Sequence, residues 1–122
     1  MMKNTLLIKN RKNYFIKASV KVNSPFTLEE TGDKISKALF ASNQFEGIDE
    51  NKCEEVPSIF LRFPIFGLDV VLQGYGDDEG YFLDIYPNQE LFNFNIESEE
   101  IDISLQILTL IEKIPILKAS LS

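Results

Sequence analysis

The sequence contains no histidine, and Cys53 is its only cysteine. Histidine is the side chain that most often moves protons near neutral pH, so its usual acid-base chemistry is excluded. One cysteine excludes an internal disulfide framework. Residues 1–15 alternate charged and apolar side chains and lack the continuous apolar run of a signal peptide or membrane span. We therefore expect a cytoplasmic protein without a membrane partner.

The chain is also short, with 122 residues of which 44% are apolar. That composition supplies one hydrophobic core rather than several. The sequence shows no internal repeat, low-complexity stretch or linker that would divide it. It predicts a single domain over residues 1–122.

Positive charge is scarce, with 12 basic against 19 acidic side chains and a net charge of −7. The imbalance lies in residues 43–104, which hold two basic and fifteen acidic side chains, whereas residues 1–42 hold eight basic and three acidic ones. An acidic segment repels phosphate and anionic lipid and attracts basic proteins. We expect a basic protein partner and no nucleic acid, although loops that only keep the protein in solution explain the same pattern.

Hydrophobic patterning predicts an α+β fold, with a single antiparallel or mixed sheet and two main helices packed on one face. Alternation, or runs of β-branched and aromatic residues, indicates strands over residues 14–22, 56–63, 65–73 and 81–86. Residues 116–121 fit either a short final strand or a docked tail. In the first strand, Tyr14, Ile16, Ala18, Val20 and Val22 form the apolar side. Residues 5–9 are an optional further strand, and residues 91–96 fit either a short strand or a packed loop.

Two helices are expected between these strands. Thr27 and Glu30 have capping-box spacing and predict a helix over residues 28–41, whose inner face carries Leu28, Ile35, Ala38 and Leu39. Ser98 is the expected N-cap of a nearly all-apolar helix over residues 99–114, which Pro115 ends. Such a helix is buried on most sides or takes part in a dimer. Residues 42–55 are expected to form an acidic loop with Phe45 and Ile48 against the core.

The strand pattern divides the middle of the chain between two faces of the sheet. Ile59, Leu61 and Phe63, with Tyr81, Leu83 and Ile85, are expected to face the helices. The opposite face then carries Phe60, Arg62, Phe82, Asp84 and Tyr86, and Asp69 is expected on the same side as Asp84. Aromatic anchors beside orienting charges are typical of protein interfaces. This face therefore receives a protein partner or is covered by residues 87–96 or a second protomer.

Asp77, Asp78 and Glu79 lie between glycines and are expected at the tip of a hairpin. A tip held by two strands loses little conformational entropy on binding and is well placed to steer a basic partner. The alternative is a solvated turn. The alternating ligands of a calcium loop are absent.

Catalytic and cofactor signatures are lacking. Asp69 and Asp84 lie on neighbouring predicted strands and are expected on the same side of the sheet, but the sequence places no His, Arg or nucleophile beside them to complete a mechanism. Cys53 has no histidine to activate it, and Gly74 and Gly76 are not followed by a phosphate-binding lysine. We expect no enzyme, no metal and no cofactor, with a small hydrolase or transferase using Asp69 or Asp84 as the enzymatic alternative.

The order of elements, with YFIKASVKV, a capped helix, SIFLRF, FGLDVVLQGY, YFLDIYP and a terminal apolar helix, resembles bacterial toxin immunity proteins. The likeness is greatest to those of contact-dependent growth inhibition. It implies a cytosolic antitoxin that binds a cognate toxin domain, commonly a basic nuclease, and inhibits it without turnover. The alternative is a secretion chaperone, which is also small and acidic and forms a homodimer through an apolar helix.

Overall fold

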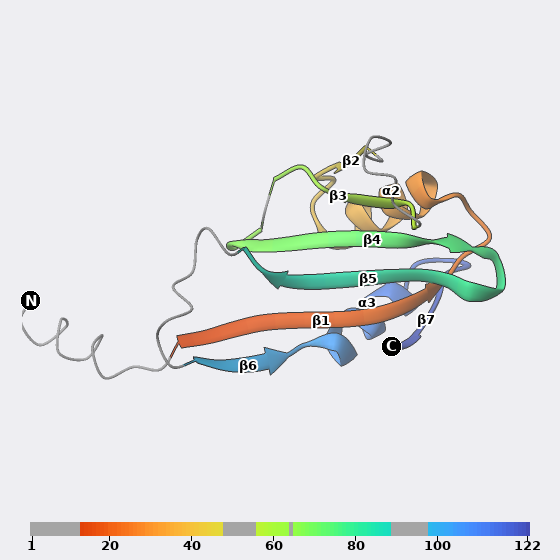
Figure 1. Cartoon of the computed structure of the whole chain (residues 1–122). Helices are drawn as coiled ribbons and strands as arrows, with labels where there is room; N and C mark the ends of the chain where they lie inside the picture. The colour runs from red at the N-terminus through yellow and green to blue at the C-terminus, as the bar shows by residue number, and fades with distance from the viewer. Residues whose placement is uncertain (1–12, 48–55, 64, 89–97) are drawn as a thin grey trace, which may run out of the picture.

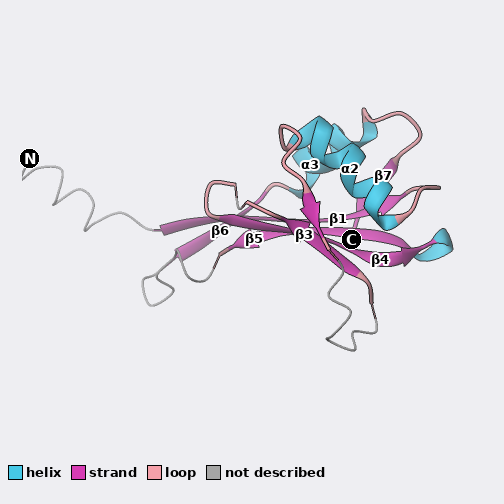
Figure 2. Cartoon of the chain, turned by 90° about the horizontal axis from the view of Figure 1, so that it is seen from above, coloured by secondary structure: helices cyan, strands magenta, loops and turns pink. Residues whose placement is uncertain are grey.

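The computed structural model describes residues 13–47, 56–63, 65–88 and 98–122. It contains one mixed, mostly antiparallel sheet of seven strands and two α-helices, so the predicted α+β class is confirmed. The strands are β1 (Asn13–Asn23), β2 (Phe45–Glu46), β3 (Ser58–Leu61), β4 (Leu68–Gly76), β5 (Gly80–Pro87), β6 (Ser98–Asp102) and β7 (Lys118–Leu121). The helices α2 (Leu28–Leu39) and α3 (Ser104–Glu112) lie on the same face of the sheet, as predicted (Figures 1 and 2).

The long strands β1, β4 and β5 form the middle of the sheet, whose order is β2-β3-β4-β5-β1-β6. β1 pairs antiparallel with β5, with Val20 opposite Leu83, and both side chains are fully buried under the helices. On its other edge β1 pairs first with β6, in parallel, and then with β7, antiparallel. The chain leaves β6 through α3 and returns as β7, so the C-terminal segment is a strand rather than a docked tail.

The predicted start of the second helix, at residue 99, is wrong. Residues 98–102 form β6 instead, because the N-terminal half of β1 offers a free edge with which they pair in parallel. The helix begins only at Ser104, whose backbone N–H donates to Asp102 Oδ1 at 2.8 Å. The residue at the N-cap position of α3 is Ile103, which makes no side-chain capping hydrogen bond, so the predicted cap at Ser98 is wrong. Ser104 donates to Asp102 from its hydroxyl as well as from its backbone N–H, and these two hydrogen bonds lower the pKa of the Asp102 carboxyl.

Helix α3 is buried along one stripe rather than on most sides. Ile107 and Ile111 are buried, as is Ile114 just beyond the helix, whereas Leu105 and Leu110 are exposed. The nearly all-apolar sequence therefore does not mean complete burial within this chain.

Helix α2 is capped as predicted but is shorter than predicted. Glu30 N–H donates to Thr27 Oγ1 and Thr27 N–H donates to Glu30 Oε1, both at 3.2 Å. The helix ends at Leu39, and Ala38 is exposed rather than on the inner face. Gly32 faces the sheet, where an added Cβ would lie 2.7 Å from Ile59 Cδ1, so this glycine allows close packing of helix and sheet.

Some predicted side-chain positions need correction. In β1 the alternation holds from Ala18 onward, but Phe15 is buried while Tyr14 and Ile16 are exposed, so the apolar side changes within the strand. Phe63 follows the end of β3 and is exposed instead of facing the helices. Phe45 packs against the core as predicted, from the short strand β2 rather than from a loop. Residues 5–9, Ile48, Cys53 and residues 91–96 lie outside the described residues.

The predicted strand over residues 65–73 is interrupted by a tight turn before β4. Ile65 and Leu68 exchange two backbone hydrogen bonds of 3.1 and 2.8 Å, which leaves Phe66 and Gly67 as a two-residue hairpin loop. Their φ angles are 52° and 73°, the left-handed values that a type I′ turn requires. A bulky residue in this region costs about 1–2 kcal/mol, so Phe66 strains the turn.

Candidate functional site

The candidate site is the face of the sheet opposite the two helices, which we call the helix-free face. Residues paired across neighbouring strands point to the same side of a sheet. Asp84 lies opposite Ser19 of β1 and Val71 of β4, and Val71 lies opposite Phe60 of β3. With the neighbouring pairs, the face comprises Ser19, Lys21, Phe60, Asp69, Val71, Gln73, Phe82, Asp84 and Tyr86.

The structure brings most of the predicted interface residues together here. Phe60 and Tyr86 are 45% and 43% exposed, which is high for aromatic side chains in the interior of a sheet. Phe82 and the carboxylates of Asp69 and Asp84 are half-buried. Asp69 is directly opposite Tyr86, and Asp84 is two residues from Tyr86 on the same side of β5. The predicted combination of aromatics and carboxylates is therefore one contiguous surface.

Hydrogen bonds fix the orientation of both carboxylates. Asp84 Oδ1 accepts from Ser19 Oγ at 2.7 Å, and Ser19 Oγ also lies 2.6 Å from Ser122 Oγ. Asp69 accepts from the side-chain amide of Asn88, with both oxygens 3.2 Å from Nδ2. A partner would therefore meet positioned negative charges, at a lower cost in conformational entropy than mobile ones.

The surroundings of Tyr86 change the pKa of its phenol. Partial burial, followed by the charges of Asp69 and Asp84, raises the pKa of its phenol above the ordinary value. All of these effects disfavour the phenolate, so the hydroxyl stays protonated and can donate a hydrogen bond at neutral pH.

Alkaline titration should report this environment. Because the pKa of Tyr86 is raised in the folded state, the protonated phenol stabilises the fold below the unfolded value of about 10, and this contribution is lost as pH rises through the folded value. In an absorbance titration at 295 nm, Tyr86→Phe should remove a component that titrates late. Replacing Asp69 and Asp84 by Asn should shift that component to lower pH, and an unchanged midpoint would contradict the assigned cause.

The acidic hairpin tip lies at the other end of the sheet. Asp77, Asp78 and Glu79 are exposed and form η2 (Asp77–Glu79), a short 3-10 helix between β4 and β5 (Figure 1). Strand β5 runs from Gly80 to Pro87, so at about 3.3 Å per residue the tip and Tyr86 are roughly 20 Å apart. The tip and the helix-free face are two separate features rather than one patch.

The first turn of α2 adds acidity near this tip, which the sequence did not reveal. Burial raises the pKa of Tyr81, and the charges of Asp77, Glu29 and Glu30 raise it further. Asp77 and Glu29 also line the same open cavity of about 420 Å³. Only the fold brings these distant sequence segments together, so no local motif could have indicated it.

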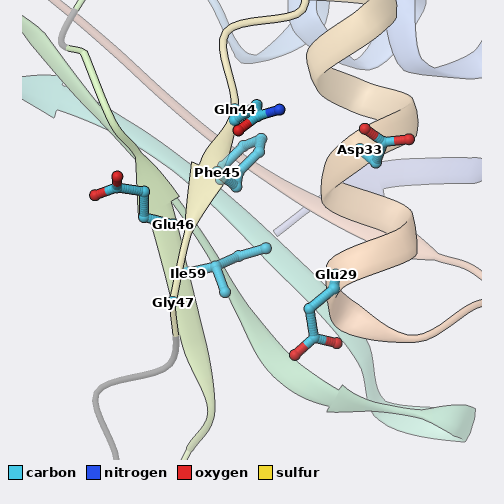
Figure 3. Close-up of a pocket in the computed structure, with 7 residues that line it drawn as sticks. All are labelled: Glu29, Asp33, Gln44, Phe45, Glu46, Gly47 and Ile59. Atoms are coloured by element: carbon cyan, nitrogen blue, oxygen red, sulfur yellow. The ribbon is translucent and has the colours of Figure 1, made fainter.

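A second acidic hollow of about 370 Å³ is lined by residues of α2, β2 and β3 (Figure 3). Phe45 and Ile59 point from the strands towards α2, Glu29 and Asp33 come from α2, and the Glu46 side chain points away from α2 on the other side of its strand. Two of these carboxylates already have partners: Asp33 pairs with Lys37 Nζ at 3.0 Å and Glu46 with Arg62 Nε at 3.2 Å. The hollow therefore lacks the set of unpaired ligands that a cation site needs.

No family model, curated protein or solved structure matches this chain. Over the described ranges, acidic side chains form no group of three or more that could hold a metal ion. In that same part of the chain, no helix has the length and apolar character needed to cross a bilayer.

Proposed function

We propose that this chain is an immunity protein, which binds a cognate bacterial toxin domain in the cytoplasm and inhibits it stoichiometrically. The observation that carries the proposal is the helix-free face, where Phe60 and Tyr86 are exposed beside the fixed carboxylates of Asp69 and Asp84. Aromatic side chains are enriched at the centres of protein interfaces, and charges beside them set the orientation of the partner. A sheet face also offers a rigid surface, because its backbone is already ordered.

The charge of the chain supports a basic partner. The net charge is −7, and the exposed tip Asp77–Glu79 adds three adjacent carboxylates at one end of the sheet. Complementary charge raises association rates and disfavours acidic competitors. A basic nuclease domain, which must itself attract phosphate, has the complementary surface.

Binding without turnover fits the hydrogen bonds of the central carboxylates. Asp84 accepts from the hydroxyl of Ser19, and Asp69 accepts from the amide of Asn88. Both donors are neutral groups that orient a carboxylate, and neither is a base or a nucleophile activated for covalent chemistry. The proposal therefore assigns these residues to recognition.

Co-expression tests the proposal directly. The proposal expects a cognate toxin domain to be encoded next to this chain, and bacteria that produce that domain should grow when the chain is co-expressed and stop growing without it. A toxin domain from an unrelated system supplies the specificity control, and it should remain toxic. Failure to rescue growth from the adjacent toxin, with both proteins produced, would remove the proposal.

The hairpin tip should steer association. Replacing Asp77, Asp78 and Glu79 together by Lys is expected to slow binding of the toxin domain several-fold at low salt and to flatten the salt dependence, because long-range attraction is lost. Stopped-flow binding at two salt concentrations measures both effects. The matched control replaces the exposed residues Glu99, Glu100 and Glu112 by Lys, which changes net charge equally. Equal slowing by both variants would show that the tip has no special role.

A dimeric secretion chaperone is the second candidate, favoured by the exposed leucines of α3. Leu105 and Leu110 are solvent-exposed, and Leu110 lines an apolar groove of about 450 Å³ between the two helices. Lys34, Lys37 and Lys113 also line this groove. A two-fold contact through the groove would bring these like charges together, and their repulsion disfavours a dimer at this place. A molar mass twice that of the chain by light scattering, returned to that of the monomer by Leu105→Lys, would favour the chaperone.

A further inference from the structure

Phe66 is the most exposed large apolar side chain in the described part of the molecule. Its side chain is 91% exposed at the tip of the turn between Ile65 and Leu68, with a φ angle of 52°. A type I′ turn favours asparagine or glycine at this position, because their side chains tolerate left-handed backbone. Asparagine at position 66 would make this turn more stable and better hydrated. Phenylalanine therefore does not contribute to the stability or the hydration of the turn.

The turn holds the Phe66 ring on a rigid support. Two backbone hydrogen bonds close the hairpin between Ile65 and Leu68, and the carbonyl of Gly67 accepts from Asn88 N–H at 2.8 Å. The side chain of Asn88 also binds the carboxylate of Asp69. These hydrogen bonds connect the turn to the helix-free face. Because the backbone of the turn is already ordered, binding of the ring costs little backbone conformational entropy.

Other recognition groups lie close to this turn. Phe63 is 61% exposed, with the Arg62 guanidinium carbon 5.2 Å from its ring centroid. Leu68, which closes the turn, pairs with Pro87, and Tyr86 is the residue before Pro87 in β5. The protruding ring thus stands at the end of the helix-free face that carries Tyr86 and Asp69.

We propose that Phe66 is an anchor that inserts into an apolar pocket on the protein bound by the helix-free face. This inference rests on the proposed function, and it adds that the toxin domain has a pocket for one aromatic ring beside its basic surface. Strained conformations persist at binding sites because the surrounding structure holds them. Asp69 and Asp84 argue for a protein rather than a membrane, because carboxylates repel anionic lipid.

The test exploits the strain at this position. Phe66→Asn should raise the melting temperature by a few degrees, since asparagine tolerates the left-handed backbone. The same variant should raise the Kd for the toxin domain by roughly tenfold or more, mainly through faster dissociation. A loss of affinity together with a gain in stability separates recognition from damage to the fold.

Ile116 supplies the matched control. It is 66% exposed with a φ angle of 77° in the turn between Ile114 and Leu117, near the opposite end of the sheet. Ile116→Asn removes a similar strain and a similar apolar surface, so it should stabilise the fold and leave the Kd unchanged. Wild-type and both variant proteins are compared by calorimetry and by surface-immobilised binding kinetics.

Each outcome decides between the two proposals. Wild-type affinity in Phe66→Asn, with binding by the wild-type chain intact, overturns the anchor and leaves the proposed function standing. Absence of binding by the wild-type chain overturns both. Three other results would also overturn the anchor. The first is an equal loss of affinity for the toxin domain in Ile116→Asn. The others are that Phe66→Asn loses self-association, or loses binding to anionic phosphatidylserine vesicles, while its affinity for the toxin domain stays unchanged.

Discussion

Tyr86→Ala is expected to weaken binding of the toxin domain by roughly 30-fold or more while the chain remains folded. Tyr86 has an exposed ring and a protonated hydroxyl on the helix-free face, and tyrosines near the centre of an interface are among the residues that dominate its binding energy. Short-range contacts form after the encounter, so the loss should appear in the dissociation rate. Asp84→Ala should act in the same direction, since its charge belongs to the same surface.

Tyr75→Ala is the control for this experiment. Tyr75 is an exposed tyrosine near the other end of the same sheet, so its removal deletes an equal side chain outside the proposed centre. Stopped-flow association and dissociation rates should be near wild type for this variant. If Tyr75→Ala weakens binding more than Tyr86→Ala, the contact lies at the hairpin end and the helix-free face is not its centre.

Leu83→Ala should lower the free energy of unfolding by about 2–5 kcal/mol, the cost of losing a buried leucine and leaving a cavity. Leu83 is fully buried in β5, between β4 and β1 and beneath the helices. A loss of this size is a large part of the total stability of an ordinary domain. Urea unfolding measures it through a lower midpoint at constant slope.

Leu105→Ala is the matched control for the core. Leu105 is an exposed leucine of α3, and surface substitutions usually change stability by less than about 0.5 kcal/mol. A comparable loss at Leu105 would show that α3 is covered by another surface, such as a second copy of the chain. A negligible loss at Leu83 would contradict the arrangement of the sheet.

Local patterns predicted the elements that depend on local interactions. The capping box of Thr27 and Glu30 starts α2 as expected, because both of its hydrogen bonds join residues three apart. The alternation of Tyr81, Leu83 and Ile85 placed the helix-free face correctly, since each strand there buries one side only. That alternation also separated Phe60, Phe82, Asp84 and Tyr86 from the core.

Features that depend on distant segments escaped the same reasoning. Residues 98–102 became a strand because they meet the free edge of β1, some 85 residues earlier in the chain. Their acidic residues followed by an apolar run match the start of a helix, so only tertiary pairing decides between the two. The turn at Phe66 escaped because type I′ turns favour asparagine at its position, although Gly67 was a local signal of such a turn.

At the acidic end of the molecule, the sequence predicted one part of the charged surface but not the other. The tip Asp77–Glu79 was visible as three consecutive acids, but its proximity to Glu29 at the start of α2 follows from the packing of the helix on the sheet. Electrostatic sites built from several segments become apparent only when the topology is known.

Titration of the toxin domain's activity tests the central claim of stoichiometric inhibition most directly. The purified toxin domain, held at a concentration far above the Kd, is assayed on its substrate with increasing amounts of this chain. Activity should fall linearly and reach zero at one equivalent of wild-type chain, whereas Tyr86→Ala should give a shallow curve that needs a large excess. Complete inactivation by a small fraction of an equivalent, or full activity at several equivalents, would contradict inhibition by one-to-one binding.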